Sequence, residues 1–138
     1  MARRATGSEA ERLFREACAK YEQAVAIKPD DHEALDNWGN TLLEMAKVAE
    51  PPIRESLFEQ AAQKLIEAEK VRPGTGAYNL ACVYALLGRA EPAEHWLRQS
   101  YAHKSLPTRS HLEADTDLDP VRHLPWFAEI LALAEDGR

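Results

Sequence analysis

Apolar residues recur along the chain at intervals of three and four positions, the spacing that lays one stripe along an α-helix. Four such stripes occupy positions 14, 17, 21 and 24; 35, 38, 42 and 45; 58, 61, 65 and 68; and 77, 80, 84 and 87. A further amphipathic segment spans 93–101, and no segment alternates at the period of two that marks a half-buried strand. The pattern therefore predicts an all-α fold.

The helical pattern contains an internal repeat. Six residues recur with the same type at an offset of 44 positions: Leu13, Phe14, Ala17, Lys20, Ala24 and Pro29 against Leu57, Phe58, Ala61, Lys64, Ala68 and Pro73. The two prolines disfavour helix in the residue before them, so they are expected to separate one repeat from the next. A repeat of this length is typical of a solenoid, in which each unit buries its apolar face against its neighbours.

These repeats resemble the tetratricopeptide repeat, which combines W-x-x-L-G-x-x-Y in its first helix with A-x-x-x-F and a closing proline in its second. The residues that match first helices are Leu35, Trp38, Gly39 and Leu42, then Ala77, Leu80, Ala81 and Tyr84. Those that match second helices are Ala17, Tyr21, Ala24 and Pro29, then Ala61, Leu65, Ala68 and Pro73, then Ala93, Leu97 and Ser100. The resemblance spans roughly residues 9–105 and implies a short right-handed superhelical solenoid of antiparallel helix hairpins.

The resemblance implies a single domain over 1–138. Its expected parts are a flexible start (1–7), the unpaired second helix of a first repeat (8–28), a second repeat (30–72), a third repeat (74–104) and a C-terminal cap (106–138). A capping box at Ser8-Glu-Ala-Glu11 predicts that the first helix starts near Ser8. Gly88 is expected to end the helix over 77–87 in a left-handed conformation.

The second repeat departs from the usual length of about 34 residues. The extra residues are expected near 47–56, where Pro51 and Pro52 predict a turn between two lengthened helices. HEAT or armadillo units, which have about 40–47 residues, are the alternative. Plant mitochondrial import receptors carry comparably lengthened repeats, but no segment that resembles their membrane anchor is expected here.

Composition narrows the class of partner and the compartment. A net charge of −6 and a pI near 5.4 argue against the basic face of a nucleic-acid-binding protein. No apolar run approaches the ~18 residues of a membrane span, and the basic start lacks the apolar region of a secretory signal. Cys18 and Cys82 form no CxxC motif and lie in helical patterns, so they are expected to be buried free thiols. Together these features predict a cytoplasmic protein.

Three patterns that suggest chemistry have simpler explanations. His95, His103, His111 and His123 are spaced too widely for the local ligand pairs of a zinc site. The run Asp115, Asp117, Asp119 lacks the glycine and glutamate of a calcium loop, so we interpret it as turn capping. The Pro73–Gly76 segment has neither the strand nor the lysine of a phosphate loop. We therefore predict no metal, no cofactor and no catalytic residue, and hence no enzyme.

In tetratricopeptide proteins the first helices of successive repeats line a concave groove. The resemblance assigns to this groove a set of polar and aromatic residues: Glu33, Asp36, Asn37, Asn40, Glu44, Tyr78 and Asn79. Asn37 and Asn79 hold equivalent positions, where an amide can both donate to and accept from a peptide backbone. The carboxylates have no basic residue among these groove positions, which favours a basic or amphipathic segment as partner.

The predicted function is therefore a scaffold or adaptor that binds a peptide or protein segment in the groove. The alternative is a structural or oligomerisation module, such as the C-terminal part of a larger protein. Because no first helix precedes the opening helix, Leu13 and its neighbours are expected to lack cover on one side. Self-association through that helix would supply the cover.

Overall fold

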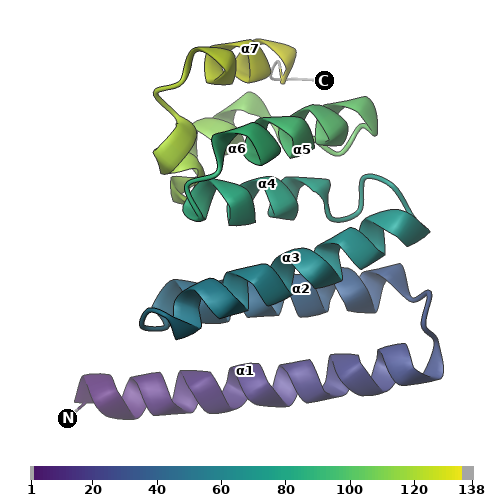
Figure 1. The fold of residues 1–138 in the computed structure, drawn as a ribbon, viewed down its shortest axis with the longest axis vertical. Coiled ribbons are helices and arrows are strands. Elements are labelled where there is room, and N and C mark those ends of the chain that lie inside the picture. The colour runs from purple at the N-terminus through teal and green to yellow at the C-terminus, as the bar shows by residue number, and fades with distance from the viewer. Residues whose placement is uncertain (1, 135–138) are drawn as a thin grey trace. The chain divides into compact units, whose positions relative to one another are not determined.

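The computed structural model describes the backbone of residues 2–134 and the side chains of residues 9–134. Its elements in chain order are α1 (Ala2–Ile27), α2 (His32–Val48), α3 (Ile53–Val71), α4 (Ala77–Leu86), α5 (Ala90–Ala102), α6 (Arg109–Ala114), the 3₁₀ helix η1 (Thr116–Val121) and α7 (Pro125–Leu133). No strand occurs within these residues, so the predicted all-α class is confirmed (Figure 1). None of the helices described is both long enough and apolar enough to span a membrane.

The chain folds as two compact units, Met1–Val71 and Arg72–Arg138. The boundary lies next to Pro73, one of the two prolines that separate the repeats in the sequence. The first unit contains α1–α3 and the second contains α4–α7. Each unit is described by itself below.

In the first unit, three long helices run antiparallel to one another in chain order (Figure 1). Asp31 caps α2, because its side chain accepts a hydrogen bond from the backbone N–H of Ala34 at 3.1 Å. The Pro51–Pro52 segment forms the turn between α2 and α3. These long helices therefore absorb the extra residues of the second repeat.

Gly39 lies where α2 packs tightly against α3. A Cβ at this position would lie 2.5 Å from Cγ of Leu65 and 3.2 Å from the carbonyl oxygen of Ala61. Leu65 is fully buried. Glycine is therefore required at this crossing, which explains the small residue in the repeat pattern.

The first helix starts earlier than the capping box predicts. It begins at Ala2, so that Ser8 lies inside the helix rather than at its N-cap. The preceding segment contains alanine and arginine, which are strong helix formers and offset the cost of about 1 kcal/mol for Gly7. Met1 lies outside the described residues.

In the second unit, the hairpin of α4 and α5 is followed by three short helices that pack onto it. Gly88 ends α4 with a φ of +78°, as predicted, and the N–H of Arg89 bonds back to the carbonyl of Tyr84 at 2.9 Å. The core of this unit consists of apolar side chains from all of its elements: Leu80, Leu97, Leu112, Leu118, Val121, Phe127 and Ile130. The segment after residue 106 is thus part of the core rather than an appendage.

Candidate protein-binding faces

The α2 stripe consists of Glu33, Asn37, Asn40, Glu44 and Val48, which follow one another at steps of three and four along one face of α2. Glu33, Asn37 and Asn40 are exposed, Glu44 is half-buried, and Val48 is 72% exposed. The opposite face of α2 holds the buried residues, so the stripe is not needed for packing. It can therefore present two carboxylates, two amides and an apolar side chain to a partner.

The charge of the α2 stripe is predominantly negative. Glu44 forms an ion pair with Lys47 at 3.5 Å, and both side chains remain partly exposed. Asp36 borders the stripe and is half-buried. At the end of the stripe, Ile53 comes after the Pro51–Pro52 turn and is 62% exposed. Acidic and apolar groups thus lie within a short stretch of the first unit.

The remaining two predicted groove residues, Tyr78 and Asn79, lie on α4 in the second unit. Tyr78 is half-buried, and its hydroxyl donates to Oδ2 of Asp115 at 2.5 Å. The ring of His111 packs edge-on against Tyr78 at 5.6 Å. The C-terminal segment therefore covers the part of α4 where the sequence predicts an apolar groove contact.

Burial is the largest cause that raises the pKa of Tyr78 above its ordinary value, followed by the nearby Cys82 and the carboxylate of Asp115. The phenol therefore stays protonated and can act as a hydrogen-bond donor. It fixes Asp115 at the start of η1, where Oδ1 of Asp115 also accepts from the N–H of Asp117 at 3.0 Å. This capping role of Asp115 agrees with the sequence interpretation of the acidic run.

The same region brings together one sulfur and two carboxylates. Ligand atoms of Cys82, Asp115 and Asp117 lie within 4.8 Å of one another. Both oxygens of Asp115 already accept the hydrogen bonds described above. The contacts of Asp115 and His111 with Tyr78 could not be found by sequence reasoning, because they join segments more than thirty residues apart.

The indole of Trp38 is held between two neighbouring helices. Nζ of Lys64 lies over its ring at 4.1 Å from the centroid. On the α1 side, burial raises the pKa of the Cys18 thiol, and a hydrogen bond with Trp38 partly offsets this effect. Sγ of Cys18 also lies 3.8 Å from Sδ of Met45. Trp38 therefore contributes to packing within the first unit.

The fold defines a class of protein: a module of helical hairpins with exposed polar faces. A family model described as "Plant specific mitochondrial import receptor subunit TOM20" matches residues 4–95. The match covers more than half of the chain, and the chain belongs to this family. No curated protein and no solved structure matches the chain.

The family assignment refines some expectations and corrects another. A receptor family agrees with a protein-binding role and with the absence of enzymatic function, and it is more specific than the tetratricopeptide resemblance. The expectation of a cytoplasmic location is wrong, because the family is that of a mitochondrial import receptor subunit. Neither the charge nor the two free cysteines carries information on which organelle the protein serves.

Proposed function

We propose that this protein is an import receptor subunit that binds a basic amphipathic segment of its cargo on the α2 stripe. The observation that carries the proposal is the family match, which includes all of α2 within residues 4–95. Segments that target proteins to mitochondria are amphipathic, rich in arginine and poor in acidic residues. That chemistry is complementary to a face with two glutamates, two asparagines and an exposed valine.

The binding mode that this chemistry favours is a short amphipathic helix on a helical surface. Arginines of the cargo would form ion pairs with Glu33 and Glu44. The side-chain amides of Asn37 and Asn40 would donate hydrogen bonds to polar groups of the cargo and accept hydrogen bonds from them. Apolar side chains of the cargo would contact Val48 and Ile53, which are 72% and 62% exposed.

Charge and apolar contact have different effects on such a complex. Exposed ion pairs contribute only about 0.2–1 kcal/mol each, so the carboxylates chiefly raise the association rate and reject acidic segments. Most of the affinity must come from apolar area removed from water. The receptor is therefore expected to bind many basic amphipathic segments with modest affinity.

The test uses a synthetic helical peptide of Arg, Ser and Leu whose leucines share one face, with a fluorescent label for anisotropy. A second peptide of the same composition, with the leucines distributed over all faces, tests for amphipathicity. The double variant Glu33→Gln/Glu44→Gln should slow association several-fold, and raised salt should reduce the rate for the unmodified chain. Asn37→Ala/Asn40→Ala should weaken binding without a change in thermal stability.

The matched control is Glu22→Gln/Glu91→Gln, which removes the same charge from exposed positions on α1 and α5. If this control slows association as much as Glu33→Gln/Glu44→Gln, only net charge matters and the α2 stripe is not the site. Equal binding of the two peptides would exclude recognition of an amphipathic face.

A further inference from the structure

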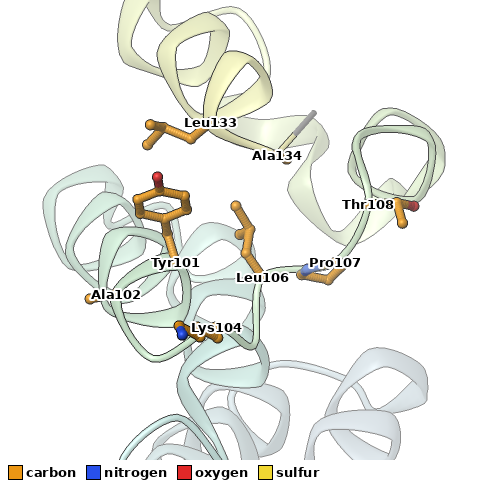
Figure 2. Close-up of a pocket in the computed structure, with 8 residues that line it drawn as sticks. All are labelled: Tyr101, Ala102, Lys104, Leu106, Pro107, Thr108, Leu133 and Ala134. Atoms are coloured by element: carbon orange, nitrogen blue, oxygen red, sulfur yellow. The ribbon is translucent and has the colours of Figure 1, made fainter. Parts of the chain in front are cut away.

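A hollow of about 520 Å³ lies in the second unit, between the end of α5, the loop after it and the end of α7. Tyr101 and Leu106 point toward Leu133 across this hollow (Figure 2). Tyr101 is 43% exposed, and the two leucines are half-buried. The volume lies in the range of roughly 300–1,000 Å³ that is typical of small-ligand pockets. The hollow lies beyond residue 95, where the family match ends.

The walls of the hollow are held in place by polar contacts. Arg98 on α5 bonds to Glu129 on α7 at 2.7 Å, which joins the two helices. The N–H of Ser105 bonds back to the carbonyl of Ser100 at 2.8 Å and ends α5. The hollow is therefore formed before a ligand arrives, which lowers the cost of binding.

The segment that forms the loop side of the hollow is basic, unlike the chain as a whole. From His95 to Leu112 the sequence has no Asp or Glu, and it carries Arg98, Lys104 and Arg109. The two arginines form ion pairs with glutamates of the same unit. Lys104 lines the hollow, is exposed, and forms no ion pair with any residue between 9 and 134. Its charge is thus available to a ligand.

The backbone of Lys104 has a φ of +61°, in the left-handed region that glycine adopts most easily. The same position at the end of α4 is occupied by Gly88, with a φ of +78°. Lysine at this position costs stability that glycine would not, and such strain is typical of sites where the side chain is used. The conformation and the free charge are two separate observations at the same residue.

We propose that this hollow is a docking site for an acidic protein segment that bears a bulky apolar side chain. The apolar side chain enters between Tyr101, Leu106 and Leu133, and a carboxylate next to it pairs with Lys104. This surface has a preference opposite to that of the α2 stripe, since the stripe favours basic segments. It would allow the protein to hold an acidic partner without competition from the cargo.

The probe is the labelled peptide Gly-Asp-Glu-Trp-Asp-Gly, followed by fluorescence anisotropy and by backbone amide NMR of the full chain. We expect binding that is lost when the tryptophan is replaced by alanine or the acidic residues by lysine. Amide shifts should concentrate at residues 101–108 and 131–134. Tyr101→Ala should weaken binding about tenfold, the size of a central aromatic contact.

Lys104→Gly separates binding from stability. It removes the charge and the strain together, so it should weaken peptide binding roughly two- to fivefold while it raises the melting temperature. Gly88→Lys is the matched control, because a Cβ there meets no atom within 4 Å and the change introduces the same strain at the end of α4. It should lower the melting temperature and leave peptide binding unchanged.

Three results would each overturn the proposal. The first is equal affinity of the acidic and lysine-substituted peptides. The second is unchanged binding by Lys104→Gly, and the third is a set of amide shifts that falls outside the hollow. None of these results bears on the α2 stripe, because the peptides used there are basic and the variants lie in the first unit.

Discussion

The first helices of the two hairpins, α2 and α4, carry equivalent positions that differ in their cover. On α2, Asn37 and Asn40 are exposed to solvent. At the equivalent positions of α4, Asn79 is half-buried and Cys82 is buried, with its Sγ 4.0 Å from Oδ2 of Asp115 in the C-terminal segment. The same helix of a repeat can therefore present an exposed polar face or lie beneath a further segment, depending on what comes after its hairpin.

Side-chain chemistry agrees with this difference. The covered helix consists almost entirely of apolar residues and buries most of them, including Cys82 and Val83. The uncovered helix alternates a buried face with a polar one. A cap thus lets a helix with little polar surface remain in a solenoid, which otherwise requires polar terminal faces.

The largest expected effect comes from the cap of the second unit. Phe127→Ala removes a ring that is 1% exposed, so the free energy of unfolding should fall by about 3–5 kcal/mol in chemical denaturation. The change should also expose the Tyr78 contact, seen as a loss of near-UV circular dichroism. Trp126→Ala is the control, because that ring is only half-buried and its loss should cost less. Equal losses of unfolding free energy in the two variants would mean that Phe127 does not anchor α7 in the core.

A moderate effect is expected at the small residues of the two hairpins. Gly39→Ala places a Cβ against Leu65 and the Ala61 backbone in the first unit, and should cost about 1–2 kcal/mol despite the better helix propensity of alanine. Ala81→Gly in the second unit should cost about 1 kcal/mol, because it lowers helix propensity without relieving a contact. Thermal denaturation of both variants checks this. A stabilised Gly39→Ala would contradict the close approach of α2 to α3.

The hydrogen bond from Tyr78 to Asp115 should make the second unit sensitive to high pH. The pKa of Tyr78 is raised in the fold, so its contribution to stability is complete below the unfolded pKa of about 10. That contribution is lost as the pH rises further, since the unfolded chain releases the proton first. Tyr78→Phe should lower stability by about 1–2 kcal/mol at neutral pH.

The pH dependence supplies the control for this variant. Above about pH 10 the difference in unfolding free energy between Tyr78→Phe and the unmodified chain should shrink. The measurement is chemical denaturation at a series of pH values. A difference that stays constant would show that the phenol proton has no part in holding Asp115.

The smallest effect concerns the cation above Trp38 in the first unit. Lys64→Met keeps the aliphatic stem but removes the charge that lies 4.1 Å from the ring centroid, and should cost about 0.5–1 kcal/mol. Lys70→Met, at the exposed end of the same helix, should be nearly neutral when both variants are compared by chemical denaturation. In the second unit Arg122 lies 5.2 Å from the ring centroid of Phe127, but it also donates to the carbonyl oxygens of Leu112 and Asp115, so Lys64 gives the cleaner test of a cation over a ring.

The all-α class could be predicted from periodicity, and the glycine at the end of α4 from local backbone chemistry. Both depend on residues close together in the sequence, which explains their success. The start of α1 could not be predicted in this way, because a capping box marks the start of a helix only where the residues before it are not helical. Here Ala2 and the arginines after it are part of the helix.

The contacts of Asp115 and His111 with Tyr78 could not be predicted either, and the reason is different. Its position depends on the burial of Leu112, Leu118 and Val121, whose partners lie far away in the sequence. Within the segment 106–138, which the sequence pattern predicts to be a cap, the structure forms α6, η1 and α7. The hollow beside Tyr101 arises from the same long-range packing, and only the acid-free stretch around Lys104 could have indicated it.

The glycine that ends α4 also sets a length scale. Because Gly88 stops the helix after ten residues whereas α2 continues for seventeen, α4 is about 15 Å long and α2 about 26 Å. A cargo helix that lies along α2 can therefore use about four to five turns. On the proposed function, the length of α2 sets how much of a targeting helix can lie in contact with the receptor.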